Sequence, residues 1–261
     1  MRKKKDTSTC WRPHPILKND WRYWVIEIRK DKGFYRACVP ALLSILNPSI
    51  RIVFTKLELD QLNDCASIHG NVSCFPQLLD RIENDLWDQK FKTTIFSVQS
   101  ITEVLSRVED MINPQSDSMK NMADSIRKYY DLQLLPFHSP MYILGLFSVI
   151  ESLITHAPKQ NDIHSSIASQ IASKLELLNK TYFKNFNVHD SRFHEIAFDK
   201  LWKKLYSYRS QIAHTAKHEI SGDLHILKSP ELVRRYVEEQ TKELLRFSLS
   251  NHEFLKYLKA C

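Results

Sequence analysis

Apolar residues recur at intervals of three and four along the second half of the chain. This spacing places them on one face of a helix, so it predicts a series of amphipathic helices. Ser139-Pro140 and Ser229-Pro230 each place an N-cap residue before a proline suited to the first helical position. The predicted helices span residues 118–130, 141–156, 165–178, 191–213, 230–247 and, as a short last helix, 253–259. Helices joined in this way form a bundle.

The first half of the chain has a mixed pattern. Aromatic and β-branched residues predict short strands at 21–28, 34–39 and 50–54, and capping boxes or apolar stripes predict helices at 55–66, 75–88 and 100–112. Residues 113–118 (NPQSDS) form the most loop-like stretch in the middle of the chain. We therefore expect a mainly α protein in which a helical bundle, residues 116–261, follows a smaller α+β region, residues 1–115.

Composition supports helices over a nucleotide-binding sheet. The 261 residues include 4 glycines, whereas average usage would give roughly 18. Tight hairpins, phosphate-binding loops and dinucleotide-binding turns all require glycine. The four glycines are isolated from one another. ATP- or GTP-driven chemistry is therefore disfavoured, and we expect no cofactor.

Positive charge is concentrated at the N-terminus. The net charge is +7, and residues 1–36 account for all of it, with 11 Lys and Arg against 4 Asp and Glu. The remaining residues hold 26 of each sign and are neutral. A wholly basic surface for nucleic acid is excluded, and a DNA-binding regulator is disfavoured. The RKKK run at residues 2–5 is either a nucleic-acid or nuclear-import segment or, as we favour, a solvated terminus.

Cysteine usage and hydropathy bear on the compartment. The five cysteines are dispersed without a C-x-x-C pair, as expected for reduced thiols in the cytoplasm. No run of 18 apolar residues is present, and no apolar segment follows the basic start. We therefore expect a cytoplasmic protein with no membrane partner and no secretory signal.

The segment 205–215 (LYSYRSQIAHT) contains the residues best suited to chemistry. Arg209 and His214 are five positions apart, which separates their side chains by about 140° on an ideal helix. The two converge only if the helix loosens near His214 or if Arg209 bends back. Without further information, both are also consistent with a basic helix C-terminus that binds the last carbonyl groups.

This segment resembles the R-x4-H signature of the HEPN superfamily, in particular its Apea-like branch. A second similarity is the segment 147–153 (FSVIESL), which resembles the acidic helix that precedes the signature in that branch. The resemblance covers roughly residues 118–258. It implies an all-α bundle that forms a homodimer, with Arg209 and His214 of both copies lining a shared cleft. Many members are metal-independent endoribonucleases that act as toxins or antiviral effectors, and others are binding modules.

The residue types suit RNA cleavage without a metal. The 2′-OH is the internal nucleophile, so the site needs a base, an acid and a cation for the phosphorane. His214 can serve as base or acid, because histidine titrates near neutral pH. Arg209 stays protonated and offers a planar set of donors to phosphate. One chain supplies too few groups, which gives a reason for activity to require a dimer.

Neighbouring residues have supporting roles in this hypothesis. Glu151 either orients Arg209 or is an acid at the polar edge of its helix. Ser210 follows the arginine where the wider superfamily often has Asn, Asp or His, and it is a weaker hydrogen-bonding group. Tyr206 and Tyr208 either contact RNA or, as we favour, pack the helix with a hydroxyl at the rim.

Two lysines and several histidines complete the candidates. Lys203 and Lys204 either guide the phosphate backbone of RNA or form a solvated face. His214, His218 and His225 lack an HExxH pattern, so we expect no metal site.

The sequence thus favours a metal-independent endoribonuclease that acts on RNA in anti-phage defence or as a toxin. An antitoxin or trigger protein is a further expected partner, and residues 1–115 would recognise the trigger or hold RNA. The alternative is a non-catalytic HEPN module that binds RNA, a nucleotide or a partner, and Ser210 favours this alternative slightly.

Overall fold

The structure is a computed structural model. It describes residues 106–108, 110–133, 135, 136, 138–157, 166–182, 193, 196–215 and 218–261, together with Leu42, Ile45 and the backbone of 56–60 and 65–69. The predicted strands at 21–28, 34–39 and 50–54 and the predicted helix at 75–88 lie outside these residues. Of the predicted helix at 100–112, residues 106–108 and 110–112 are described and are helical.

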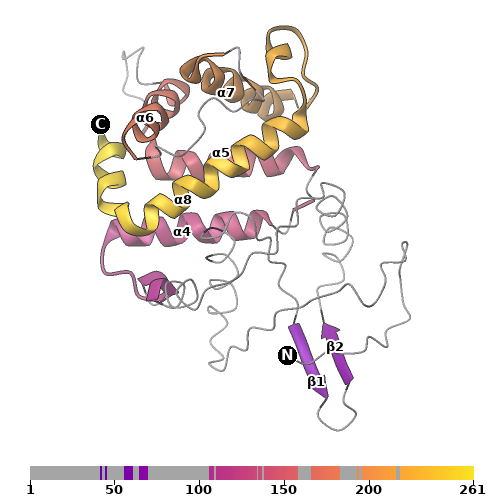
Figure 1. The fold of residues 1–261 in the computed structure, drawn as a ribbon, viewed down its shortest axis with the longest axis vertical. Coiled ribbons are helices and arrows are strands. Elements are labelled where there is room, and N and C mark those ends of the chain that lie inside the picture. The colour runs from indigo at the N-terminus through magenta and orange to yellow at the C-terminus, as the bar shows by residue number, and fades with distance from the viewer. Residues whose placement is uncertain are drawn as a thin grey trace.

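The described part of the C-terminal half is helical, as the apolar periodicity predicts. Five helices and one 3-10 helix follow one another along the chain (Figure 1). They are α4 (Asp117–Leu132), α5 (Pro140–Ile154), α6 (Ile167–Thr181), α7 (Phe198–Thr215), η5 (Gly222–Leu227) and α8 (Pro230–Ala260). Within these described residues, no helix is both long and apolar enough to cross a membrane.

Serine residues start four of the helices. The side chains of Ser116, Ser139, Ser166 and Ser229 each accept a hydrogen bond from a backbone N–H in the first turn of α4, α5, α6 and α8 respectively. Such caps satisfy N–H groups that have no partner within the helix. The predicted Ser-Pro starts of α5 and α8 are confirmed. For α4 the cap is Ser116, and the helix begins at Asp117, one position before the predicted start at residue 118.

Three elements differ from the predictions. The predicted helix at 55–66 is wrong, because Lys56–Asp60 (β1) and Cys65–His69 (β2) pair as an antiparallel hairpin. Leu57 and Leu59 alternate with charged residues, and this period-two pattern outweighs the capping box. Helix α7 begins at Phe198 rather than near residue 191. The two last predicted helices form one element, α8, with a kink at Asn251 (φ −131°, ψ 30°).

Helix α5 is the centre of the bundle and contacts α4, α6, α7 and α8. Helix α4 lies on one side of α5 and α8, and α6 and α7 lie on the other (Figure 1). Eight of the fifteen residues of α5 are buried, as expected for a helix at the centre of a bundle. Gly145 permits the close approach of α4, since a Cβ there would overlap the Leu132 side chain. The only charged residue of α5 is Glu151.

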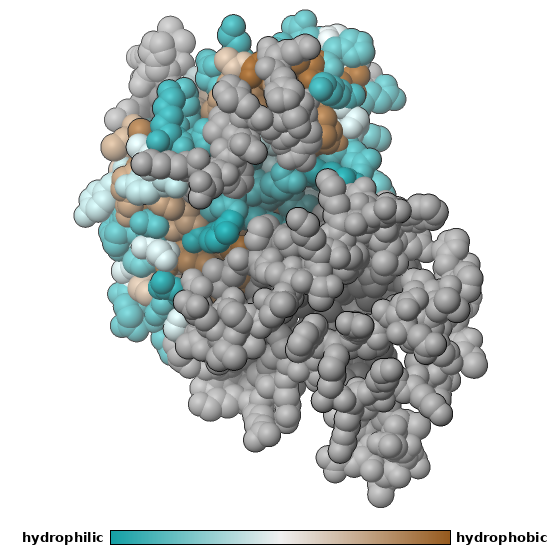
Figure 2. Space-filling model, in the orientation of Figure 1, coloured by the Kyte–Doolittle hydropathy of each residue, from teal (hydrophilic) through white to brown (hydrophobic). Residues whose placement is uncertain are grey.

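The surface of the bundle is mixed. Figure 2 shows hydrophobic residues lying among hydrophilic ones on the face in view. The large hydrophobic residues that are exposed, within the described part, are Met141, Leu177, Tyr182 and Tyr257. They come from α5, the α6 end and α8. Isolated exposed hydrophobic residues are normal, so this pattern does not by itself define a binding surface.

Candidate functional site

Aromatic packing sets the rotation of α7 against α5. Trp202 is fully buried and packs edge-on against Phe147 of α5, with ring centroids 6.2 Å apart. Tyr206, one turn later, packs against the same ring at 5.9 Å. Arg209 follows Trp202 by seven residues, which is two helical turns, so it lies on the same side of α7. The packing therefore directs Arg209 toward the next turn of α5, where Glu151 lies.

Arg209 and Glu151 form an ion pair between these two helices. The Arg209 Nη2 atom lies 3.3 Å from Glu151 Oε1, and the two side chains are 26% and 24% exposed. Helices predicted separately from the sequence thus bring together Arg209 of the R-x4-H segment and Glu151 of the acidic segment. The contact between the Glu151 carboxylate and Arg209 is the one that an orienting role of Glu151 requires.

Tyr206 completes this cluster. The Arg209 Cζ atom lies 5.4 Å from the centroid of the Tyr206 ring, within the range of a cation–π contact. The Tyr206 hydroxyl also interacts with the Glu151 carboxylate, which lowers the pKa of Glu151 and raises that of Tyr206. The sequence favours helix packing over RNA contact for Tyr206 and predicts no contact between Tyr206 and Arg209. The signal that could have identified it is its spacing, three residues before Arg209 and on the same helix face.

Burial dominates the electrostatics of the cluster. It raises the pKa of Glu151 above its ordinary value, and the positive charge of Arg209 and the hydrogen bond from Tyr206 oppose this rise without cancelling it. Burial also raises the pKa of Tyr206, and the neighbouring Glu151 charge adds to that effect. The ionised carboxylate is therefore held in a partly desolvated position, where its interaction with a cation is strong.

The ion pair between Arg209 and Glu151 leaves some of their hydrogen-bonding groups without a partner among the described residues. Arg209 Nε and Glu151 Oε1 are both buried and have no hydrogen-bond partner among the described residues. The contact between Nη2 and Oε1 is thus an ion pair rather than a well-aligned hydrogen bond. Because a bidentate pair would use two donors of the guanidinium, this arrangement leaves more donors for another acceptor.

His214 lies apart from this cluster. It is exposed in the last turn of α7. The helix continues through Thr215, whose hydroxyl donates to the Gln211 carbonyl at 2.7 Å. The helix therefore does not loosen near His214, and Arg209 extends to α5 rather than bending toward the histidine. Within one chain, the two signature residues face different directions.

The other predicted site residues have separate environments. Ser210 is half-buried on α7 beside Arg209. Tyr208 is fully buried, and its hydroxyl donates to the His218 carbonyl at 2.7 Å. Burial raises the pKa of Tyr208 to about 12, against an opposing effect of Arg234. Tyr208 thus ties α7 to the following segment, in agreement with the packing role favoured above.

Lys203 and Lys204 lie on the outer surface of α7. Lys203 Nζ is 3.6 Å from Asp199, and Lys204 Nζ is 3.8 Å from Asp223 of η5. The lysine side chains are 54% and 37% exposed. Their charge is accessible and partly offset by the carboxylates, so their contribution to phosphate binding would be modest.

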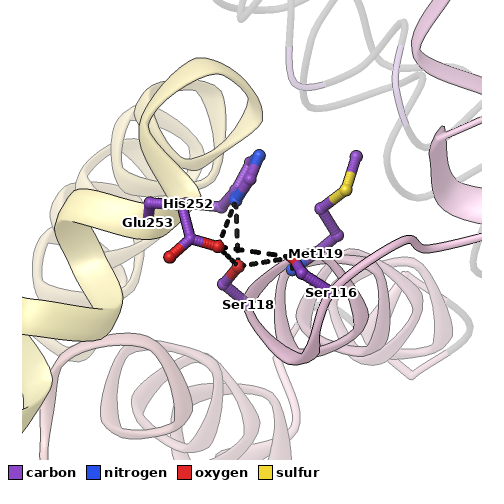
Figure 3. A network of polar contacts seen from close by, with 5 residues as sticks. All are labelled: Ser116, Ser118, Met119, His252 and Glu253. Atoms are coloured by element: carbon purple, nitrogen blue, oxygen red, sulfur yellow. Dashed lines mark hydrogen bonds and ion pairs between the residues drawn. The ribbon is translucent and has the colours of Figure 1, made fainter.

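A second polar cluster joins α4 to the end of α8 (Figure 3). The Ser118 hydroxyl lies 3.1 Å from His252 Nδ1 and 2.7 Å from the Ser116 hydroxyl, and it donates to Glu253. The Ser118 hydrogen bond is the main factor that lowers the pKa of Glu253. No local sequence signal predicts this cluster, because only the fold brings the part of α8 beyond its kink to the start of α4.

A hollow of about 190 Å³ adjoins this second cluster, lined by residues that include Asn121, Leu153, Leu255 and Lys259. Lys259 donates to the Ser152 carbonyl at 2.8 Å and Asn121 donates to the same carbonyl at 3.2 Å. Both polar side chains thus bind the last turn of α5. The second cluster is a helix-capping network, and we assign it no catalytic role.

No group of three or more His, Cys, Asp or Glu side chains that could hold a metal ion occurs in the described part of the chain. Comparisons with protein-family models, curated proteins and solved structures found no match to this chain. The geometry of the Glu151–Tyr206–Arg209 cluster and the sequence are therefore the grounds for assigning a function.

Proposed function

We propose that this protein is a metal-independent endoribonuclease of the HEPN type, of the Apea-like branch, acting as a homodimer. The ion pair between Arg209 and Glu151 supports this proposal most directly. It joins the arginine of the R-x4-H segment to the acidic helix 58 residues earlier, and these are the two segments in which the sequence resembles that family.

The exposed position of His214 provides a chemical reason for the protein to act as a dimer. Because His214 and Arg209 of one chain face different directions, a second copy is needed to bring a histidine to a phosphate bound at Arg209. In a symmetric cleft, two copies supply two arginines and two histidines. The same exposure makes His214 available for such a contact.

The reaction then follows from these groups. One His214 takes the proton from the 2′-OH, whose oxygen attacks the adjacent phosphorus. The bond from phosphorus to the 5′-oxygen breaks, and the other His214, protonated, donates to that oxygen. The products are a 2′,3′-cyclic phosphate and a 5′-OH. Arg209 stabilises the phosphorane charge, which is the largest effect in many such sites.

In this proposal the protein acts in the cytoplasm as an anti-phage effector or a toxin, with an antitoxin or trigger protein as a regulator. A second candidate is a non-catalytic module that binds RNA or a nucleotide. Its support is the Glu151 carboxylate, which already neutralises much of the Arg209 charge, and the presence of Ser210 after the arginine.

The test is cleavage of a structured RNA in EDTA by the wild type, Arg209→Ala and His214→Ala. We expect cleavage with 2′,3′-cyclic phosphate ends in the wild type and a loss of at least about 100-fold in each variant. Arg235→Ala and His225→Ala are matched controls. Arg235 is ion-paired with Glu231 at 2.8 Å on α8, and His225 is exposed on η5. Both controls should cleave as the wild type does.

Mixing the wild type with an excess of His214→Ala tests the shared cleft. A mixed dimer keeps both arginines but only one histidine, so it lacks either the base or the acid, and activity should fall further than dilution of the wild type alone explains. RNA binding without cleavage by the wild type would favour the non-catalytic module. Equal cleavage by the wild type and both variants would rule out the assigned site.

A further inference from the structure

Tyr206 contacts both members of the Arg209–Glu151 pair. Its ring lies against the guanidinium, with 5.4 Å between the ring centroid and Cζ, and its hydroxyl interacts with the carboxylate. The residue is half-buried, so these contacts are partly shielded from water. One side chain thereby constrains the cation in two ways, directly and through its counter-ion.

The ring itself is fixed by the core. Phe147 is fully buried and packs edge-on against Tyr206 at 5.9 Å, and it also contacts Trp202 at 6.2 Å. An edge-to-face pair has a preferred orientation, so it resists rotation of the Tyr206 ring. Packing between α5 and α7 thus fixes the Tyr206 ring, and the ring restrains the long, flexible side chain of Arg209, which has few other restraints.

Arg209 needs such restraint. Its Nε has no hydrogen-bond partner among the described residues, and its contact with Glu151 is at 3.3 Å without ideal alignment. A guanidinium held by one ion pair alone could rotate and offer its donors in several directions. The flat face of an aromatic ring restricts the plane of the guanidinium, which is what binding of phosphate in a defined direction requires.

We propose that Tyr206 is a positioning residue that fixes the plane of the Arg209 guanidinium, through its ring and through the interaction of its hydroxyl with Glu151. The effect of this positioning on RNA cleavage rests on the proposed function. The positioning itself concerns only the folded protein, so the two can be tested separately.

The first experiment requires no activity. By NMR we would measure the rate at which the Arg209 guanidinium rotates about its Cζ–Nε bond and the titration of the Glu151 carboxyl. Tyr206→Phe keeps the ring and removes the hydroxyl, and Tyr206→Leu removes both. We expect rotation to be slowest in the wild type, faster in Tyr206→Phe and fastest in Tyr206→Leu. The Glu151 titration should move to higher pH in Tyr206→Phe, because a hydrogen bond to the ionised form is lost.

Matched controls are Tyr257→Phe and Tyr257→Leu, since Tyr257 is an exposed tyrosine on α8 with 68% of its surface accessible. Neither should alter the two Arg209 and Glu151 signals. Thermal unfolding would show that each Tyr206 variant is folded at the temperature of measurement. Unchanged guanidinium rotation in folded Tyr206→Leu would overturn the proposal.

The second experiment separates binding from chemistry in cleavage. At saturating RNA, the single-turnover rate should fall about 3-fold in Tyr206→Phe and at least about 10-fold in Tyr206→Leu, because a displaced group loses much of its catalytic effect. The half-saturating RNA concentration should change less than about 3-fold. A fall in affinity with an unchanged rate would overturn the positioning role in catalysis. If the wild type does not cleave RNA while the NMR result holds, the proposed function fails and the positioning of Arg209 stands.

Discussion

At the scale of single residues, Glu151 is the least expected feature of the bundle. It is the only charged residue of the central helix α5 and lies between segments that are almost wholly apolar. Burial of a carboxylate is unfavourable unless a cation and hydrogen-bond donors compensate it. Arg209 and Tyr206 supply both, and the raised pKa of Glu151 indicates that this compensation is incomplete. A residue retained at such a position is suited to orienting a functional cation.

The raised pKa of Glu151 predicts how its replacement changes stability. Below the ordinary pKa of glutamate, the carboxyl is neutral in the folded and unfolded states and contributes nothing. As pH rises through that value, the unfolded state loses the proton first, so the wild type loses stability until pH exceeds the raised folded-state pKa. Glu151→Gln should therefore match the wild type in acid and be more stable at neutral pH.

Urea denaturation of both proteins between pH 4 and pH 8 measures this difference. Arg209 remains 26% exposed and can bind water when its partner is neutral. Glu176→Gln on α6 is the control, because Glu176 forms an ion pair with Lys180 at the surface. A Glu151→Gln variant that is less stable than the wild type at neutral pH would contradict the assignment of burial as the dominant effect.

At the scale of elements, apolar periodicity and capping residues were sufficient to predict most helices of the bundle. Four of the five described helices begin within two residues of where the apolar stripes and serine caps place them, because both signals are local. The errors occurred where tertiary packing decides. The late start of α7 and the joining of α8 across Asn251 have no strong local signal. The hairpin at 56–69 was missed because Thr55-x-x-Glu58 satisfies a helix rule while the alternation of Leu57 and Leu59 satisfies a strand rule.

In the candidate site too, local sequence signals predict some features, and tertiary packing decides the others. The sequence alone was enough to nominate Arg209, His214 and Glu151 as residue types suited to phosphate chemistry. It could not show that Tyr206 rather than Tyr208 contacts Arg209, since both are aromatic neighbours on one helix. Their environments differ because Trp202 sets the rotation of α7, which turns Tyr208 into the core and Tyr206 toward Glu151.

The ends of α5 and α8 are joined by a buried lysine, and this predicts an effect on stability. Lys174 of α6 is 7% exposed, and its Nζ donates to the carbonyls of Ile154 at 3.0 Å and Lys259 at 3.3 Å. Lys174→Met keeps the volume but removes a donor from buried acceptors. We expect a loss of about 1–3 kcal/mol in the free energy of unfolding.

The matched control is Lys180→Met on the same helix. Lys180 is 70% exposed and pairs with Glu176 at the surface, so its replacement should change stability by less than about 0.5 kcal/mol. Chemical denaturation followed by circular dichroism compares the two variants. Equal stability of Lys174→Met and the wild type would mean that the lysine does not cap these helix ends.

At the scale of the whole molecule, charge and the candidate site are separated along the chain. Residues 1–36 hold the whole net charge of +7, whereas the segment with Arg209 belongs to a neutral remainder. The lysines closest to Arg209 in sequence, Lys203 and Lys204, each face a carboxylate. Attraction of RNA to the cluster by global basicity is therefore weak. In our proposal, affinity comes from the basic N-terminal residues and local contacts, and chemistry comes from Arg209 and His214.

This separation of RNA binding from cleavage predicts effects of different size for two triple substitutions of lysine. Replacing Lys3, Lys4 and Lys5 by Gln should weaken RNA binding and reduce the slope of log affinity against log salt by up to about 2, since each contact with single-stranded RNA releases about 0.7 counter-ion. The cleavage rate at saturating RNA should stay the same.

The same replacement at Lys120, Lys180 and Lys256, which are exposed on the bundle, removes equal charge and should change the slope less. Because both triple variants have the same net charge, a difference in slope reports where RNA lies. If the N-terminal variant lowered the rate at saturating RNA, the basic residues would take part in the chemistry, and binding and cleavage could not be assigned to separate parts of the chain.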